Sequence, residues 1–123
     1  MSGLYDQQNI FAKILRGDIP CNKVDECDHT LSFYDIQPQR KVHILVIPKG
    51  AYTDMTDFCT NASAEEQTAY FAAIARVVGI AGLEKSGYRL IANTGTDGHQ
   101  DVPHLHIHIL GGEAVGPMLH RKA

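Results

Sequence analysis

Three histidines alternate with aliphatic residues near the end of the chain. Leu105 and Ile107 separate His104, His106 and His108. In a β-strand this spacing places the three imidazole rings on one face and the aliphatic side chains on the other. The pattern therefore predicts a strand that is anchored in the core by one face. Its other face would present a row of rings that titrate near neutral pH.

Two chemistries can use such a row. The first is zinc binding, but His104 and His108 would lie ~13 Å apart along a regular strand. Zn–N bonds of about 2.1 Å do not let three such histidines share one ion easily, and no other strong cluster supplies ligands. The second is nucleophilic attack on phosphorus by the middle imidazole, with its neighbours positioning it and moving protons. Spacing alone leaves catalysis, metal binding and a structural role open, although the strand pattern excludes a purification tag.

Other candidate residues carry little information by themselves. His43 lies in an apolar strand pattern, where a hydrogen-bonded core histidine is the ordinary expectation. Asp35 follows a strand, and Asn93 ends the run RLIAN, so both occupy positions that are typical of turns.

Composition restricts the class of protein. The chain has 123 residues, and its 11 Lys and Arg against 14 Asp and Glu give a formal charge of −3. This length predicts a single domain over residues 1–123, without a broad cationic surface for nucleic acid. The longest apolar run, residues 44–47, is too short to cross a membrane, and no signal peptide is evident. Three cysteines without a C-x-x-C pair favour a reducing compartment, so we expect a cytoplasmic protein.

Apolar periodicity predicts an α+β fold. Helical spacing covers residues 7–16 and 63–81, and the longer helix should begin with a capping box of Ser63 and Glu66. One apolar stripe of that helix is expected to include Tyr70 and Phe71. Strand patterns cover residues 23–26, 30–34, 41–49, 87–93 and 103–110. The third strand is apolar on both faces and should be central in a mainly antiparallel sheet, with the helices on one side.

Longer motifs resemble the histidine-triad (HIT) superfamily, whose signature is His-φ-His-φ-His-φ-φ with φ apolar. HLHIHIL at residues 104–110 matches this signature. IFAKILRGDIP, FYDIQPQRKVHILVIPK and YRLIANTGTDGHQDV precede it in the order and spacing of the Hint branch. The resemblance covers about residues 9–120. The ending LGG…GPM is similar to that of bacterial-type purine nucleoside phosphoramidases.

The resemblance implies a HIT fold: a five-stranded antiparallel sheet with two helices, extended across a homodimer. Its core would span about residues 9–112 and its C-terminal tail residues 113–123. The implied reaction cleaves the P–N bond of purine nucleoside 5′-phosphoramidates through a nucleotidyl-histidine, without a metal or cofactor. Two alternatives stay open. They are a dinucleoside polyphosphate hydrolase, which the ending disfavours, and a nucleotide-binding adaptor protein whose hydrolysis is incidental.

The same resemblance implies roles for individual residues. His106 matches the nucleophile, with His104 and His43 behind it and its second ring N–H donated to a backbone carbonyl. Asp35 matches the carboxylate that accepts hydrogen bonds from the ribose hydroxyls. The apolar slot for the base comprises Ile10, Phe11, Ile14, Phe33 and Ile36. The phosphate-facing groups comprise Asn93, His99, Gln100, Asp101, Val102 and His108.

Some positions depart from the family pattern. Asp101 stands where eukaryotic-type members have Ser, so a carboxylate facing the phosphate would repel it and weaken nucleotide binding. His99 stands where Gly is usual. Asn9 and Ala12 replace the cysteine pair of a structural zinc site found in some members, so that site is expected to be absent.

Overall fold

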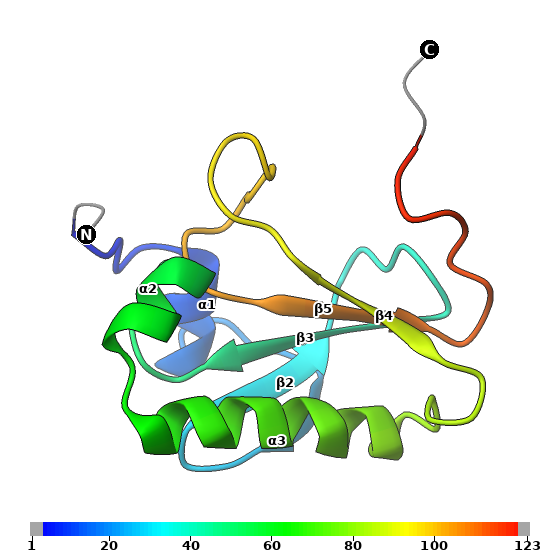
Figure 1. Ribbon diagram of the computed structural model, residues 1–123. Helices are drawn as coiled ribbons and strands as arrows, with labels where there is room; N and C mark the ends of the chain where they lie inside the picture. The colour runs from blue at the N-terminus through cyan, green and yellow to red at the C-terminus, as the bar shows by residue number, and fades with distance from the viewer. Residues whose placement is uncertain (1–3, 121–123) are drawn as a thin grey trace.

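The computed structural model describes residues 4–120 and contains a five-stranded antiparallel sheet in the order β1–β2–β3–β5–β4 (Figure 1). The elements are α1 Ile10–Leu15, β1 Lys23–Glu26, β2 Thr30–Tyr34, β3 Val42–Pro48, α2 Met55–Asn61, α3 Ala64–Ile80, β4 Tyr88–Ala92 and β5 Ile107–Gly111. The predicted α+β class and antiparallel sheet are confirmed. Residues 1–3 and 121–123 of the predicted domain lie outside the described residues.

Strand β3 occupies the centre of the sheet, as its two apolar faces predicted. Ile44 and Val46 are fully buried in the cluster that includes α3. Leu45 and Ile47 point to the opposite face and pack in the cluster that includes Phe11 of α1. His43 shares the second face with them, because side chains of a strand alternate.

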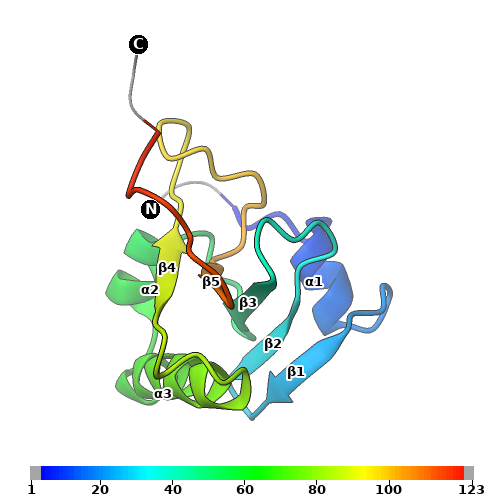
Figure 2. The same ribbon diagram turned by 90° about the vertical axis from the view of Figure 1, so that its right-hand side faces the viewer.

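Helices cover both faces of the sheet. Figure 2 shows α1 on one side of the strands and α3 on the other. Phe11 packs against Phe33 on the α1 side, whereas Phe58 of α2 and Tyr70 of α3 belong to the other cluster. The expectation that the helices lie on one side was wrong. Both faces of β3 are apolar, so each needs a covering layer.

Helix α2 was not predicted, so the described residues contain three helices rather than two. Asp54 caps it by accepting a hydrogen bond from the Asp57 N–H at 2.8 Å, and Phe58 is fully buried. The helix has seven residues and buries one apolar side chain, which is too little for a periodic signal.

The two predicted helices begin and end at recognisable caps. Asn9 caps α1, and Gly17 follows it with a φ of +85°. Ser63 and Glu66 form the predicted capping box at the start of α3. Tyr70 is buried as expected, but Phe71 is 52% exposed. Neighbouring helical residues point about 100° apart, which places Phe71 outside the buried stripe.

The histidine segment is a strand only in its second half. Strand β5 begins at Ile107, so His104 and His106 precede it and the predicted strand over residues 103–110 is wrong. Val46 and Ile107 form the last pair of the β3–β5 ladder. The Leu105 N–H instead donates to the Tyr52 carbonyl at 2.8 Å. Leu105 is therefore bonded to the loop after β3 and not to a neighbouring strand.

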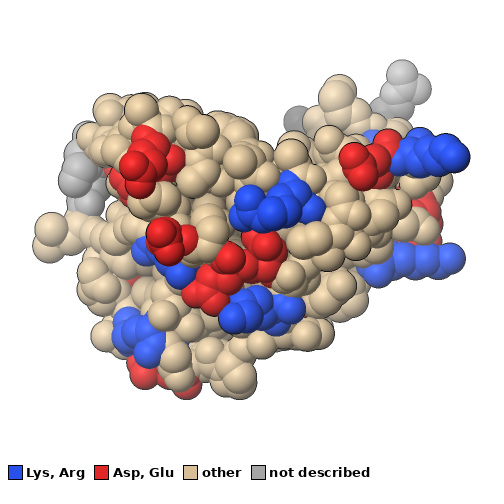
Figure 3. All heavy atoms as spheres, turned by 90° about the horizontal axis from the view of Figure 1, so that it is seen from below, with Lys and Arg blue, Asp and Glu red and all other residues tan. Residues whose placement is uncertain are grey.

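Surface charges alternate in sign. On the face shown in Figure 3, acidic and basic side chains are interspersed. Ion pairs among the described residues include Arg76–Asp25 and Lys49–Glu26. The expected lack of a broad cationic area therefore holds for that face. Within residues 4–120, no helix combines the length and the apolar character needed to cross a bilayer.

The described part of the C-terminal tail is bound to the sheet by arginines. Arg40 donates to the Val115 carbonyl at 2.7 Å. Arg89 of β4 donates to the carbonyls of Gly116 and Pro117 at 2.7 and 3.0 Å. The segment after β5 is thus held by side-chain hydrogen bonds to backbone rather than by a hydrophobic core.

A buried hydroxyl joins α3 to the sheet and gives a test of this packing. Tyr70 Oη donates to the Val46 carbonyl at 2.8 Å, and Tyr70 is fully buried. Tyr70→Phe removes this bond, and we expect unfolding free energy to fall by about 1–2 kcal/mol in urea denaturation. The matched substitution Phe71→Leu on the exposed face should cost less than about 0.5 kcal/mol. Equal stability of Tyr70→Phe and the parent protein would contradict this account.

Candidate active site

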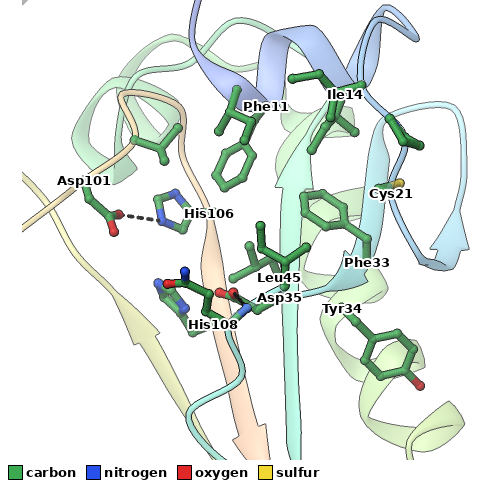
Figure 4. Close-up of a pocket in the computed structure, with 16 residues that line it drawn as sticks. Phe11, Ile14, Cys21, Phe33, Tyr34, Asp35, Leu45, Asp101, His106 and His108 are labelled. Atoms are coloured by element: carbon green, nitrogen blue, oxygen red, sulfur yellow. Dashed lines mark hydrogen bonds and ion pairs between the residues drawn. The ribbon is translucent and has the colours of Figure 1, made fainter.

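A cavity of about 320 Å³ lies on the α1 side of the sheet. Phe11, Ile14 and Phe33 line an apolar part, and His106 and His108 line the other part, beside Asp35 and Asp101 (Figure 4). This volume is within the range of small-ligand sites, and an apolar wall with a few convergent polar groups is typical of them.

Most of the residues expected to bind a nucleotide line this cavity. They are Ile10, Phe11, Ile14, Phe33, Asp35, Ile36, Asp101, Val102, His106 and His108. Sequence reasoning missed further lining residues, namely Ile19, Pro20, Cys21, Tyr34, Gln37 and Leu45. Two signals could have indicated some of them: Ile19 and Pro20 end a motif already recognised, and Leu45 alternates with His43 on β3.

Five expected site residues, His99 among them, do not line the cavity. His104 and His43 lie behind His106 and His108, and both are buried. Gln100 donates through its side-chain amide to the Thr53 and Val102 carbonyls at 2.7 and 2.9 Å, so it holds the loop together. Asn93 is half-buried at the start of this loop. Contact of Gln100 and Asn93 with a phosphate stays a prediction.

His99 adopts a backbone conformation that is uncommon for a residue with a side chain. Its φ is +59°, in the left-handed region that favours glycine. This conformation accounts for the glycine that the family pattern has there. The His99 side chain is exposed and is not among the cavity-lining residues, and its contact with a phosphate also stays a prediction.

The hydrogen bonds of His106 determine which of its nitrogens is free. Nδ1 lies 2.7 Å from the His104 carbonyl oxygen. A carbonyl can only accept, so Nδ1 carries the proton and Nε2 of the neutral ring keeps its lone pair. The expected backbone acceptor is thereby confirmed. His106 is 3% exposed and contacts the ring of Phe11 at a centroid distance of 4.9 Å, so its orientation is well restricted.

His104 is fully buried, and both of its nitrogens are engaged. Nε2 donates to the Pro48 carbonyl at 2.8 Å, and Nδ1 accepts from the Tyr5 hydroxyl at 2.5 Å. Burial lowers the pKa of His104 to about 4, so the ring is neutral at pH 7. His104 therefore positions the backbone that orients His106 and has no free nitrogen for proton transfer.

His43 and His108 form a directed hydrogen-bond chain. The Gln39 backbone N–H donates to His43 Nδ1 at 3.0 Å, which places the His43 proton on Nε2. His43 Nε2 lies 2.9 Å from His108 Nδ1 and donates to it. His108 must then carry its own proton on Nε2. Burial, followed by the positive charges of nearby histidines, lowers the pKa of His108 to about 4, so it donates as a neutral ring.

Ligand atoms of Asp35, His43 and His108 lie within 4.8 Å of one another, a cluster that sequence reasoning did not foresee. Two histidines and a carboxylate are a common ligand set for divalent metals. A metal on His43 Nε2 would need the proton moved to Nδ1, where it would face the Gln39 N–H across 3.0 Å. The hydrogen bonds therefore favour a proton relay over metal ligation.

Tyr5 is a positioning residue that the sequence did not reveal, and it can be tested. Tyr5→Phe keeps the ring packed edge-on against His104, at a centroid distance of 5.6 Å, but removes the donor to Nδ1. An unpaired buried acceptor costs about 1–3 kcal/mol, so we expect a lower unfolding free energy. We also expect a lower kcat at nearly unchanged KM. Phe71→Leu, on the exposed face of α3, is the control. A Tyr5→Phe protein with parental stability and kcat would refute the role.

The buried neutral histidines also predict how stability depends on pH. The pKa values of His104 and His108 lie near 4 in the folded state, below the ordinary value of about 6.5 for an unfolded chain. Unfolding therefore takes up protons below about pH 6.5, and stability that is complete above this pH is lost as pH falls toward 4. Calorimetry between pH 7.5 and 4.5 should show a falling Tm.

One exposed pair acts in the opposite direction on this pH profile. Glu65 raises the pKa of His29, which it contacts at 2.6 Å, so this pair adds stability as pH falls. The variant His29→Gln should therefore lose Tm at least as steeply as the parent protein. A Tm that is constant from pH 7 to 5 in both proteins would contradict the burial of neutral histidines.

Comparison with known proteins agrees with this geometry. The HIT domain model matches residues 16–115. A HIT-like protein of Azospirillum brasilense is 52% identical over 97% of this chain and 98% of its own length. The purine nucleoside phosphoramidase of Escherichia coli K12 is 41% identical over 94% and 97%. The crystal structure of a HIT family hydrolase from Legionella pneumophila superimposes with a TM-score of 0.82 at 34% identity, covering 89% of this chain and 96% of that one.

Sequence motif, cavity and comparisons thus lead to the same family. His104 and His106 are buried and His108 is half-buried, and all three are hydrogen-bonded beside a cavity. Solved HIT proteins share the arrangement of strands and helices around them. The chain belongs to the HIT domain family and aligns with hydrolases of that family over most of its length.

Proposed function

We propose that this protein hydrolyses the P–N bond of purine nucleoside 5′-phosphoramidates and releases a nucleoside monophosphate and an amine. The observation that carries the proposal is the His106 Nδ1–His104 carbonyl hydrogen bond of 2.7 Å, which leaves the Nε2 lone pair free at the cavity. The name of the Escherichia coli relative, purine nucleoside phosphoramidase, supports the choice of substrate.

The cavity suggests how the substrate binds. A flat purine fits the apolar slot, where Phe11, Ile14 and Phe33 offer burial and aromatic contact. Asp35 lines the cavity next to this slot, and its carboxylate can accept hydrogen bonds from the ribose hydroxyls. The 5′-phosphorus can then lie at His106, which lines the same cavity and contacts Phe11 of the slot.

The first chemical step forms a covalent intermediate. His106 Nε2 attacks the phosphorus, the Nε2–P bond forms and the P–N bond to the amine breaks. The amine leaves after its nitrogen takes a proton from solvent, and His108 Nε2–H, on a ring 5.0 Å from that of His106, can donate a hydrogen bond to the phosphoryl group. The His106 ring becomes positively charged when its Nε2 bonds to phosphorus. The His104 carbonyl, which accepts from Nδ1–H, stabilises this charge.

The second step regenerates the enzyme. Water attacks the phosphorus of the nucleotidyl-histidine, and the P–Nε2 bond breaks. The water gives one proton to solvent, which balances the proton that the amine took in the first step. The nucleoside monophosphate is released, and His106 returns to its neutral tautomer. A nucleotide-binding adaptor would need the base slot and Asp35 but not a His106 whose Nε2 lone pair is free at the cavity, and this favours hydrolysis.

Substitution of the nucleophile tests the reaction. His106→Ala should lower kcat by several orders of magnitude toward adenosine and guanosine 5′-phosphoramidates, because the covalent route is lost. Nucleotide affinity, measured by calorimetry with AMP, should stay largely intact. Diadenosine polyphosphates are included beside the phosphoramidates to separate the two hydrolase alternatives. A near-normal kcat of His106→Ala would contradict the assignment of His106 as nucleophile. Faster turnover of the polyphosphates would favour the dinucleoside polyphosphate hydrolase instead.

We further propose that the protein forms a homodimer through β4. This strand is an edge of the sheet, and its Tyr88 and Leu90 side chains are 46% and 44% exposed. An uncovered edge strand with apolar side chains favours pairing with a second copy.

Light scattering at micromolar concentration tests the dimer. The parent protein should have about twice the chain mass, and Leu90→Lys should shift it toward the monomer. Lys13→Glu, on the distant helix α1, serves as a control for surface charge. A monomeric parent protein that retains its activity would count against the dimer.

A further inference from the structure

The charges that line the cavity are unusual for a protein expected to bind a phosphate. Among the described lining residues, Asp35 and Asp101 are the side chains with a formal charge, and none is Lys or Arg. His43 and His108 do not compensate for these charges, because burial lowers their pKa values. An anionic substrate therefore enters a site whose fixed charges are negative.

Asp101 lies next to the reacting nitrogen. Its Oδ1 is 3.9 Å from His106 Nε2, and the side chain is 77% exposed. In Figure 4, Asp101 lies on the opposite side of His106 from Phe33 and the base slot. A phosphorus poised for attack lies about 3–3.5 Å from the nucleophile, so groups bound to it come within reach of this carboxylate.

The two ends of a substrate meet different surroundings in this arrangement. The nucleoside occupies the slot formed by Phe11, Ile14 and Phe33, and Asp35 is placed for its ribose. The other substituent on phosphorus, the leaving amine, must extend away from the slot toward the open side. Asp101 is the charged side chain on that side.

We propose that Asp101 selects leaving groups that carry a positive charge. The preferred substrates would be nucleoside 5′-phosphoramidates whose amine bears a second, protonated amino group a few bonds from the P–N bond. This inference rests on the proposed function and adds the chemical class of its leaving group. The cation would contact the Asp101 carboxylate and supply the positive charge that the cavity wall lacks.

The same carboxylate distinguishes substrate from product. A phosphoramidate carries one negative charge on its phosphoryl group, whereas a nucleoside monophosphate carries about −1.5 to −2 at pH 7, as other phosphate monoesters do. Asp101 thus repels the product more than the substrate and favours its release. Polyphosphates carry still more negative charge, which this site does not balance.

A pair of nearly isosteric substrates tests the inference. The adenosine 5′-phosphoramidate of 1,4-diaminobutane ends in an ammonium group, and that of n-pentylamine ends in a methyl group. For the parent protein we expect kcat/KM to be about five- to tenfold higher for the ammonium substrate at low salt. The ratio should approach one in Asp101→Asn and decrease in high salt. Asp97→Asn, which removes an exposed charge from the same loop outside the cavity, should keep the parental ratio.

Binding of AMP gives an independent readout. Asp101→Asn and Asp101→Ser should bind AMP severalfold more tightly than the parent protein in calorimetry, with the gain reduced by salt. Asp97→Asn should not change the affinity.

The outcomes separate this inference from the proposed function. Hydrolysis of both substrates at equal kcat/KM by the parent protein, or a preference that persists in Asp101→Asn, would overturn the role of Asp101 alone. Loss of the preference in Asp97→Asn as well would assign it to the charge of the whole loop and would also overturn it. If the parent protein hydrolyses neither substrate, the proposed function itself fails, and the inference fails with it.

Discussion

The hydrogen bond from His106 Nδ1–H to the His104 carbonyl is the interaction on which the site depends. A neutral imidazole has one protonated and one free nitrogen, so fixing the proton on Nδ1 directs the lone pair of Nε2 into the cavity. The bond joins residues two positions apart. It forms here in the irregular segment before β5, where the His104 carbonyl is not used in the β3–β5 ladder.

Further contacts hold this segment in place. His104 is anchored through Nε2 to the carbonyl of Pro48, the last residue of β3, and through Nδ1 to Tyr5 from the start of the chain. Pro48 thus ends the central strand and supplies an acceptor for the histidine behind the nucleophile. Because α1 follows Tyr5 closely and lies over the same face of the sheet, one part of the chain supports His104 and also supplies Phe11 to the base slot.

Some of this arrangement could be predicted from the sequence, where local preference and tertiary packing agree. The bounds of β1 and β2, the capping box of α3 and the central position of β3 follow from turn residues, capping chemistry and apolar alternation. The strand prediction failed at His104 and His106, because period-two spacing does not show whether a partner strand is present. Residues 104–107 are all buried, so burial does not alternate there either. Helix α2 was missed because Phe58 is its one fully buried apolar side chain. The contacts of Tyr5 and Gln39 could not be predicted, since they depend on which backbone and side-chain groups the fold brings beside buried rings.

The electrostatics of the site follow from the same contacts. Buried histidines that are locked as neutral rings offer N–H donors and lone pairs, but they do not attract anions over a distance as Lys or Arg would. With Asp35 and Asp101 as the formal charges of the described cavity wall, the site gains little from the negative charge of a phosphate. Under the proposed function, recognition rests on burial of the base, on Asp35 and on the charge of the group that departs. A site that binds phosphate weakly also holds a dianionic product weakly, so the absence of a cationic side chain from the described wall favours turnover over retention of the nucleotide.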